Sequence, residues 1–149
     1  MPGHGRGDAP AGATPSRTTI VAIVLGIELA IALVHVLHLG RLLEGVAFTL
    51  YTGFASDVLV PFGIYFLLVP QEGTLPALRP WAAKAALVFA AASFAEVAQG
   101  LGVPLLGRTF DPLDFIMFAI GVLLAAVMDR RVLAPCCRVW RERASPLPD

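Results

Sequence analysis

Residues 19–39 have the sequence TIVAIVLGIELAIALVHVLHL, an apolar run long enough to form a helix that crosses a bilayer. An α-helix rises about 1.5 Å per residue, so about 20 residues span the roughly 30 Å of hydrocarbon. Arg6 and Arg17 precede the run, as basic residues precede the hydrophobic core of a signal peptide. The run is too long for a signal-peptide core and no small-x-small cleavage site follows it, so we expect a membrane anchor.

The composition of the whole chain supports a membrane protein. Hydrophobic residues make up 57% of the 149 residues and charged residues 15%, against about 45–50% and about 25% in an average soluble domain. The formal net charge is zero, whereas binding to nucleic acid needs an excess of basic side chains. We therefore expect one membrane domain and no nucleic-acid partner.

Three further apolar segments complete the prediction of an all-α, four-helix transmembrane bundle. The expected spans are residues 19–39, 52–69, 81–101 and 112–133, within a membrane domain of residues 18–134. Asp57 and Pro61 interrupt the second segment, so we start that helix near residue 52. Residues 46–51 then either lie at the interface or enter the membrane as a re-entrant piece. Residues 1–17 and 135–149 are predicted to be a disordered tail and a basic tail.

The arginines predict the orientation. Five of them lie at or beyond the end of the fourth span: Arg130, Arg131, Arg138, Arg141 and Arg143. Short loops rich in Lys and Arg stay in the cytoplasm, so we expect the bacterial cytoplasmic (inner) membrane with both termini cytoplasmic. Trp81 and Trp140 are then expected at the inner interface, where tryptophan is enriched.

In this orientation the polar residues of the spans gather at their outer ends. A charged side chain at a helix centre costs roughly 2.5 to 3.5 kcal/mol, so it normally faces a partner, a cavity or a substrate path. We predict a shared outer pocket. Its binding residues are Asp57, Glu96, Gln99, Arg108, Asp111 and Asp114.

The third and fourth spans carry a recognisable pattern. A Glu-x-x-Gln ends the third span, an Arg-x-x-Asp-x-x-Asp leads into the fourth, and a Gly follows; the residues are Glu96, Gln99, Arg108, Asp111, Asp114 and Gly121. The pattern resembles the VanZ-like family of small bacterial membrane proteins over about residues 57–128, with Asp57 and Tyr65 as looser matches. Phe118 and Ala125 stand where the family often carries Asn and Gly. The resemblance implies a cell-envelope role of the kind associated with glycopeptide antibiotic resistance, and it supplies no reaction.

Three functions are compatible with these residues. In the first, the pocket recognises an anionic lipid or a lipid-linked cell-wall precursor, with Arg108 on the phosphate and Glu96 as candidate acid or base; whether the protein is an enzyme stays open. In the second, it is a small ion- or proton-coupled transporter or channel subunit in which Glu28, His35 and Glu96 relay protons, with His38 as a further candidate. A homo-oligomer would compensate for having only four helices. In the third, a structural membrane subunit, the polar groups simply join helices at about 0.6 kcal/mol each.

Metal binding has weaker support. His35 and His38 lie three residues apart, as zinc ligands can, but no nearby Cys or third His completes a set. Cys136 and Cys137 are adjacent, which disfavours a structural disulfide, and we expect two reduced thiols. We expect neither a metal nor a cofactor.

Overall fold

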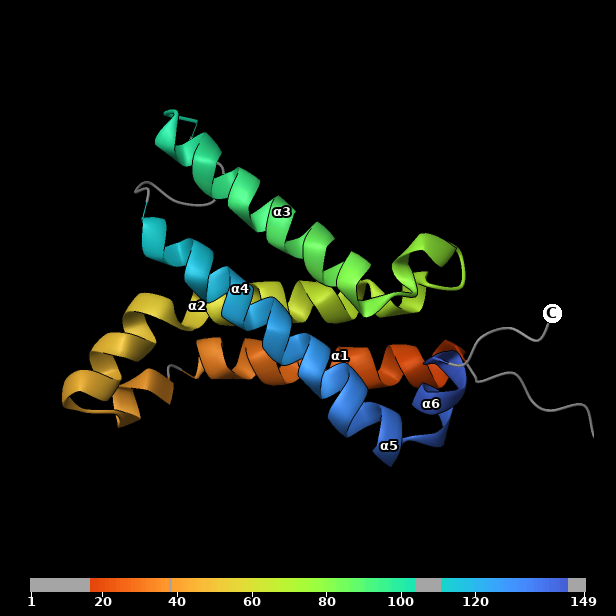
Figure 1. Cartoon of the computed structure of the whole chain (residues 1–149). Coiled ribbons are helices and arrows are strands. Elements are labelled where there is room, and N and C mark those ends of the chain that lie inside the picture. Colours follow the sequence, from red (N-terminus) through yellow and green to blue (C-terminus); the bar gives the residue numbers. More distant parts are fainter. Residues whose placement is uncertain (1–16, 38, 104–110, 145–149) are drawn as a thin grey trace, which may run out of the picture.

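The computed structural model describes residues 17–37, 39–103 and 111–144. Over these ranges the chain is helical without strands, which confirms the predicted all-α class (Figure 1). The long helices are α1 (Arg17–Val36), α2 (Gly45–Leu67), α3 (Trp81–Gly100) and α4 (Pro112–Val127). The short ones are η1 (Leu39–Leu42), η2 (Val69–Gln71), η3 (Pro76–Leu78), the π-helical η4 (Met128–Leu133), α5 (Ala134–Cys136) and α6 (Arg138–Ala144).

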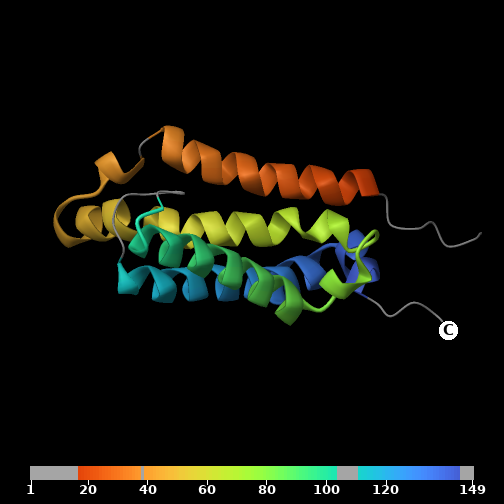
Figure 2. The same cartoon turned by 90° about the horizontal axis from the view of Figure 1, so that it is seen from above.

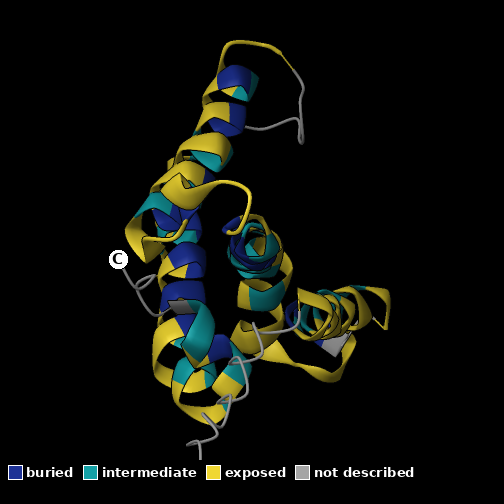
Figure 3. Ribbon diagram, turned by 90° about the vertical axis from the view of Figure 1, so that its right-hand side faces the viewer, coloured by how far each residue is buried: buried dark blue, intermediate teal, exposed yellow. Residues whose placement is uncertain are grey.

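Four segments are long and apolar enough to cross a membrane. They are Arg17–Val36, Gly45–Gln71, Trp81–Gly100 and Pro112–Cys136. Large apolar side chains on them are exposed, such as Leu29 at 60% and Phe94 at 70%. Figure 3 shows exposed residues in yellow along all of the long helices. Hydrocarbon around the helices would cover these side chains, as expected for a multi-pass membrane protein.

Helix α2 lies at the centre of the bundle. Helix α1 packs on one side of it, and α3 and α4 lie on the other (Figure 2). The described chain begins and finishes at one end, which we call the terminal end; the opposite end is the distal end (Figure 1). Helices α2 and α4 approach closely at Gly121, where a Cβ atom would overlap the carbonyl oxygen of Val58. Small residues allow such close helix crossings in membranes.

The start of α2 differs from the prediction. Residues 46–51 are the first turns of a helix that begins at Gly45, so they form no separate interfacial or re-entrant piece. Gly45 has a φ of +59°, a conformation that glycine adopts without strain. The Tyr51 hydroxyl donates to the carbonyl of Val34 at 3.1 Å, and a Cβ at Gly40 would overlap the Tyr51 ring. These contacts with the end of α1 and with η1 fix the early turns.

The segment after α4 also differs from the prediction. We expected a tail from residue 135, but the chain folds back as α5 and α6 at the terminal end. Trp140 is fully buried, and its ring lies 6.2 Å from that of Phe66, centroid to centroid. Burial of this large side chain stabilises the fold-back, so Trp140 is a core residue and not an exposed interfacial anchor.

Candidate functional site

Four carboxylates meet at the distal end, and we call them the acidic cluster: Asp57 on α2, Glu96 on α3, and Asp111 and Asp114 at the start of α4. Glu96 is only 3% exposed, and its Oε1 accepts a hydrogen bond from the backbone N–H of Asp111 at 2.7 Å. Asp57 interacts electrostatically with Glu96 and Asp111, and Asp114 with the other three. Three helices therefore bring these predicted residues together.

The end of α3 sets the position of Glu96. Gly102 has a φ of +85°. Two backbone hydrogen bonds terminate the helix there. The N–H of Val103 donates to Ala98 and that of Gly102 to Gln99, both at 2.9 Å. This is the Schellman arrangement, which the left-handed conformation of a glycine makes possible. Glu96 consequently lies about one turn before the end of α3, near the start of α4.

The start of α4 sets the position of the two aspartates. Asp111 is the N-cap, and its Oδ1 accepts from the N–H of Leu113 at 2.9 Å. Pro112 follows at the first helical position, where its missing N–H costs nothing. Asp114 then lies in the first turn, where the helix dipole favours a negative charge. One backbone N–H bound to Glu96 thus joins the two helix ends.

Among the described residues, the acidic cluster has an excess of negative charge. Within the described ranges, no Lys, Arg or His forms an ion pair with its four carboxylates. Like charges that lie close together repel one another. A cationic group of a ligand would offset this repulsion. No group of three or more His, Cys, Asp or Glu side chains in the described part of the chain is placed to hold a metal ion.

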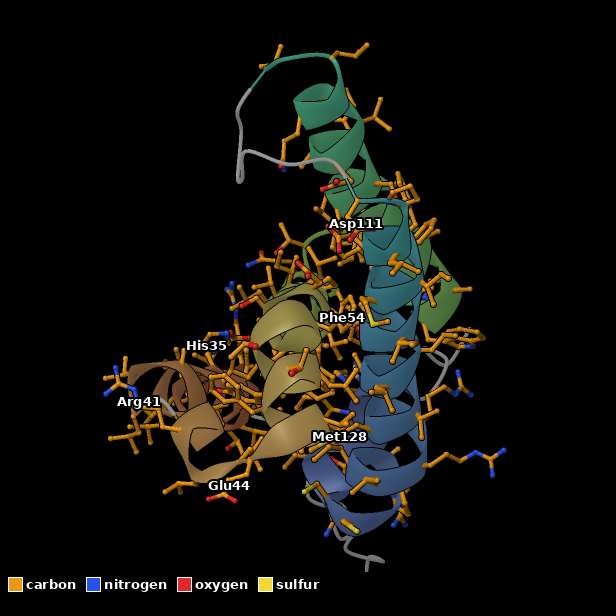
Figure 4. All side chains as sticks on the ribbon, turned by 90° about the vertical axis from the view of Figure 1, so that its left-hand side faces the viewer. His35, Arg41, Glu44, Phe54, Asp111 and Met128 are labelled. Carbon is orange, nitrogen blue, oxygen red and sulfur yellow. The ribbon has the colours of Figure 1, made fainter. Side chains whose placement is uncertain are left out.

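The other predicted site residues are distributed as follows. Gln99 is half-buried in the last turn of α3, one turn from Glu96. His35 lies between α1 and α2, where Nδ1 donates to the carbonyl of Ile31 at 2.9 Å and Nε2 is 3.2 Å from the Ser56 hydroxyl. Figure 4 shows α2 between His35 and Asp111. Arg108, His38 and residues 1–16 lie outside the described residues.

Glu28 lies at the contact between α1 and α2. Its carboxylate faces Gly63, where a Cβ atom would be only 2.9 Å from Oε2. Oε1 is buried and has no hydrogen-bond partner among the described residues. Glu28 and His35 are seven positions apart on α1, or about 10 Å along the helix axis. The two side chains therefore do not form a direct proton relay.

A second polar group, which we did not predict, lies at the terminal end. We call it the buried ion network, and its members are Tyr65, Glu72, Lys84, Asp129, Trp140 and Arg143. Lys84 is 1% exposed; its Nζ donates to Glu72 Oε1 at 2.5 Å and to the carbonyl of Leu78 at 3.2 Å. The ammonium also lies 5.2 Å from the centre of the Tyr65 ring. Lys84 is therefore enclosed by acceptors and aromatic carbon.

Asp129 is the acceptor that joins the rest of the network. Its Oδ2 accepts from the Tyr65 hydroxyl at 2.8 Å; its Oδ1 accepts from Trp140 Nε1 at 2.7 Å and from Arg143 Nη2 at 2.5 Å. Arg143 also donates to Glu72, and its guanidinium lies 4.7 Å from the centre of the Trp140 ring. Two acids thus balance two bases, and α6 is joined to the membrane helices.

The sequence contained one signal for this network. Lys84 is the only lysine of the chain and lies one turn inside the third span. A lone ammonium at that depth requires an acid, and Glu72 and Asp129 at the ends of the adjoining spans were available. We had used the basic residues at this end to predict the orientation. The part played by Arg143 depends on the fold-back of α6, which hydropathy does not reveal.

No family model, curated protein or solved structure matches this chain. The likeness to VanZ-like proteins therefore stays a prediction that rests on its residues. Of those residues, Glu96, Asp111 and Asp114 lie together in the acidic cluster, and Gly121 lies at the crossing of α2 and α4.

Proposed function

We propose that this protein is a VanZ-like multi-pass protein of the bacterial cytoplasmic membrane, that its terminal end faces the cytoplasm, and that the acidic cluster binds a lipid-linked ligand of the cell envelope. The positions of the arginines support the orientation, because Arg130, Arg131 and Arg143 all lie at the terminal end. The acidic cluster would then face the outer leaflet.

The observation that carries the proposal is that four carboxylates lie near one another with no ion pair among the described residues. Four carboxylates attract a cation and repel a simple anionic headgroup. A ligand that bears both an amino group and a phosphate satisfies both parts of the predicted site, with the amine on the carboxylates and the phosphate on Arg108. Lipid-linked cell-wall precursors combine these groups in one molecule. An amine-bearing phospholipid does so as well.

We assign no reaction to the site. Glu96, the candidate acid or base, is buried and accepts the N–H of Asp111. This hydrogen bond favours a positioning role, in which Glu96 holds the start of α4 against α3. Asp57 and Asp114 are more accessible than Glu96 and are the better candidates for ligand contact.

The test is a binding measurement with the protein in nanodiscs. The probe is a polyprenyl-linked precursor with a free peptide amine, compared with the same precursor after N-acetylation and with phosphatidylethanolamine. We expect Asp114→Asn and Arg108→Ala each to weaken precursor binding at least tenfold, and acetylation to do the same for the wild type. Glu44→Gln, which removes an exposed acid near the start of α2, is the matched control. Equal affinity of wild type and Asp114→Asn would refute the proposal.

The transporter alternative keeps one supporting observation, the buried Glu28 oxygen without a partner among the described residues. The arrangement of the other groups counts against it. Glu28 and His35 lie on the α1 side of α2, whereas Glu96 lies on the α3 side (Figure 2). A relay through all three would have to cross α2.

A further inference from the structure

A groove lies at the terminal end beside the start of α3 and the end of α4. Its volume is about 340 Å³, and its lining residues are Trp81, Leu123, Ala126, Val127, Arg130 and Arg131. Leu123 and Val127 are 54% and 55% exposed and form an apolar floor. The two arginines lie at the end of the groove nearest the membrane boundary, since they follow the apolar part of α4.

The local backbone explains why two consecutive arginines border one groove. Residues 128–133 form the π-helical η4, whose wider turn alters the direction of successive side chains. Asp129 is buried in the ion network, whereas Arg130 and Arg131 are exposed. Neither guanidinium has a hydrogen bond or an ion pair within the part of the chain that the structure describes. The groove thus carries two uncompensated positive charges.

We propose that this groove is a binding site for an anionic phospholipid. The guanidinium groups of Arg130 and Arg131 bind the phosphate, for which their planar donor geometry is well suited. One acyl chain lies over Leu123 and Val127, and Trp81 lies beside the headgroup, where tryptophan is favoured. The volume fits a headgroup and the first part of a chain, and basic pockets between membrane helices are typical sites for acidic lipids.

Charge argues for a lipid and against a second copy of the chain. In a two-fold symmetric dimer through this face, the same surface meets itself. Arg130 and Arg131 of each copy would then face those of the other, and like charges across an interface are unfavourable. A phospholipid brings the opposite charge and an apolar chain together, and it is present wherever the protein is inserted. The site lies at the opposite end from the acidic cluster and does not depend on it.

The test is native mass spectrometry of the purified protein with added lipid. The probes are dioleoylphosphatidylglycerol and, as the uncharged comparison, dioleoylphosphatidylcholine. We expect the wild type to retain the anionic lipid at least tenfold better. Replacing both groove arginines, Arg130→Gln with Arg131→Gln, should remove that preference. Val127→Trp should reduce binding by filling the groove while both charges stay.

Arg17→Gln is the control, because Arg17 is another exposed arginine of the terminal end but does not line the groove. It should bind lipid as the wild type does. Because all the substituted side chains are exposed, the variants should keep the wild-type unfolding midpoint. The proposal is overturned if the double variant retains the preference for phosphatidylglycerol. It is equally overturned if the wild type is a lipid-free dimer that Val127→Trp dissociates.

Discussion

Replacement of Lys84 by Met tests whether the buried ion network stabilises the bundle. Met preserves most of the side-chain volume and removes the ammonium. Lys84 donates to Glu72 and lies 3.9 Å from Asp129 Oδ2. Without it, Arg143 is the one remaining base of the network beside two buried carboxylates.

The expected loss of stability is large. Removing one partner of a buried ion pair typically costs about 3 to 5 kcal/mol, because the other charge is left uncompensated in a low dielectric. Two features favour the upper part of this range, since Lys84 is 1% exposed and both carboxylates are buried. A loss of this size is a substantial share of the roughly 5 to 15 kcal/mol that stabilises a typical protein.

The measurement is equilibrium unfolding in mixed micelles of increasing SDS content, followed by tryptophan fluorescence. Trp140 is fully buried within the network and reports its opening, whereas Trp81 is partly exposed. Arg138→Met is the control: Arg138 pairs with Glu142 at the same end, but the arginine is exposed, so we expect no measurable change. Combining Lys84→Met with Glu72→Gln restores charge balance and should recover much of the loss. A Lys84→Met variant as stable as the wild type would refute the reasoning.

Three further predictions follow from other contacts. Gly121→Ala should lower stability by about 1 to 3 kcal/mol in the same SDS titration, because the new Cβ would overlap the Val58 carbonyl. Gly26→Ala is the control and should leave stability unchanged, since its Cβ would meet no atom within 4 Å. Equal effects of the two substitutions would contradict the close crossing of α2 and α4. An amine-reactive ester should leave Lys84 unmodified in the folded protein and modify it after SDS unfolding, as read by peptide mass spectrometry; rapid labelling of the folded form would show that the network is open. Liposomes with wild-type protein or with Glu28→Gln should conduct protons no faster than empty liposomes, whereas a flux that the substitution abolishes would favour the transporter alternative.

The helices were largely predictable because hydrophobic length is a local property. The start of α3 at Trp81 and that of α4 at Pro112 match the prediction, since a proline marks each boundary. The predicted start of α2, near residue 52, was wrong because we took Asp57 to mark the membrane surface. Tyr51 fixes the earlier turns by its bond to Val34 on another helix, and such a contact leaves no trace in the hydropathy of either segment.

The candidate site was predictable only as far as the expected depth of its residues in the membrane determines it. Residues at the same ends of antiparallel spans share a level in the membrane, which is why Asp57, Glu96 and Asp111 were expected to meet. Depth says nothing about which helices are neighbours. His35 was expected at a similar depth, yet it lies on the other side of α2 and contacts Ser56.

The contrast between the two ends of the bundle bears on function. If polar residues in this chain only joined helices, both ends should be equally well compensated. At the terminal end, Glu72 and Asp129 are each bonded to a base, and Tyr65 and Trp140 supply further donors. At the distal end, the acidic cluster accepts two backbone N–H bonds, one at Glu96 and one at Asp111, and has no ion pair among the described residues. Since like charges that lie close together repel one another, the acidic cluster lies at the end where a ligand's positive charge would contribute most to stability.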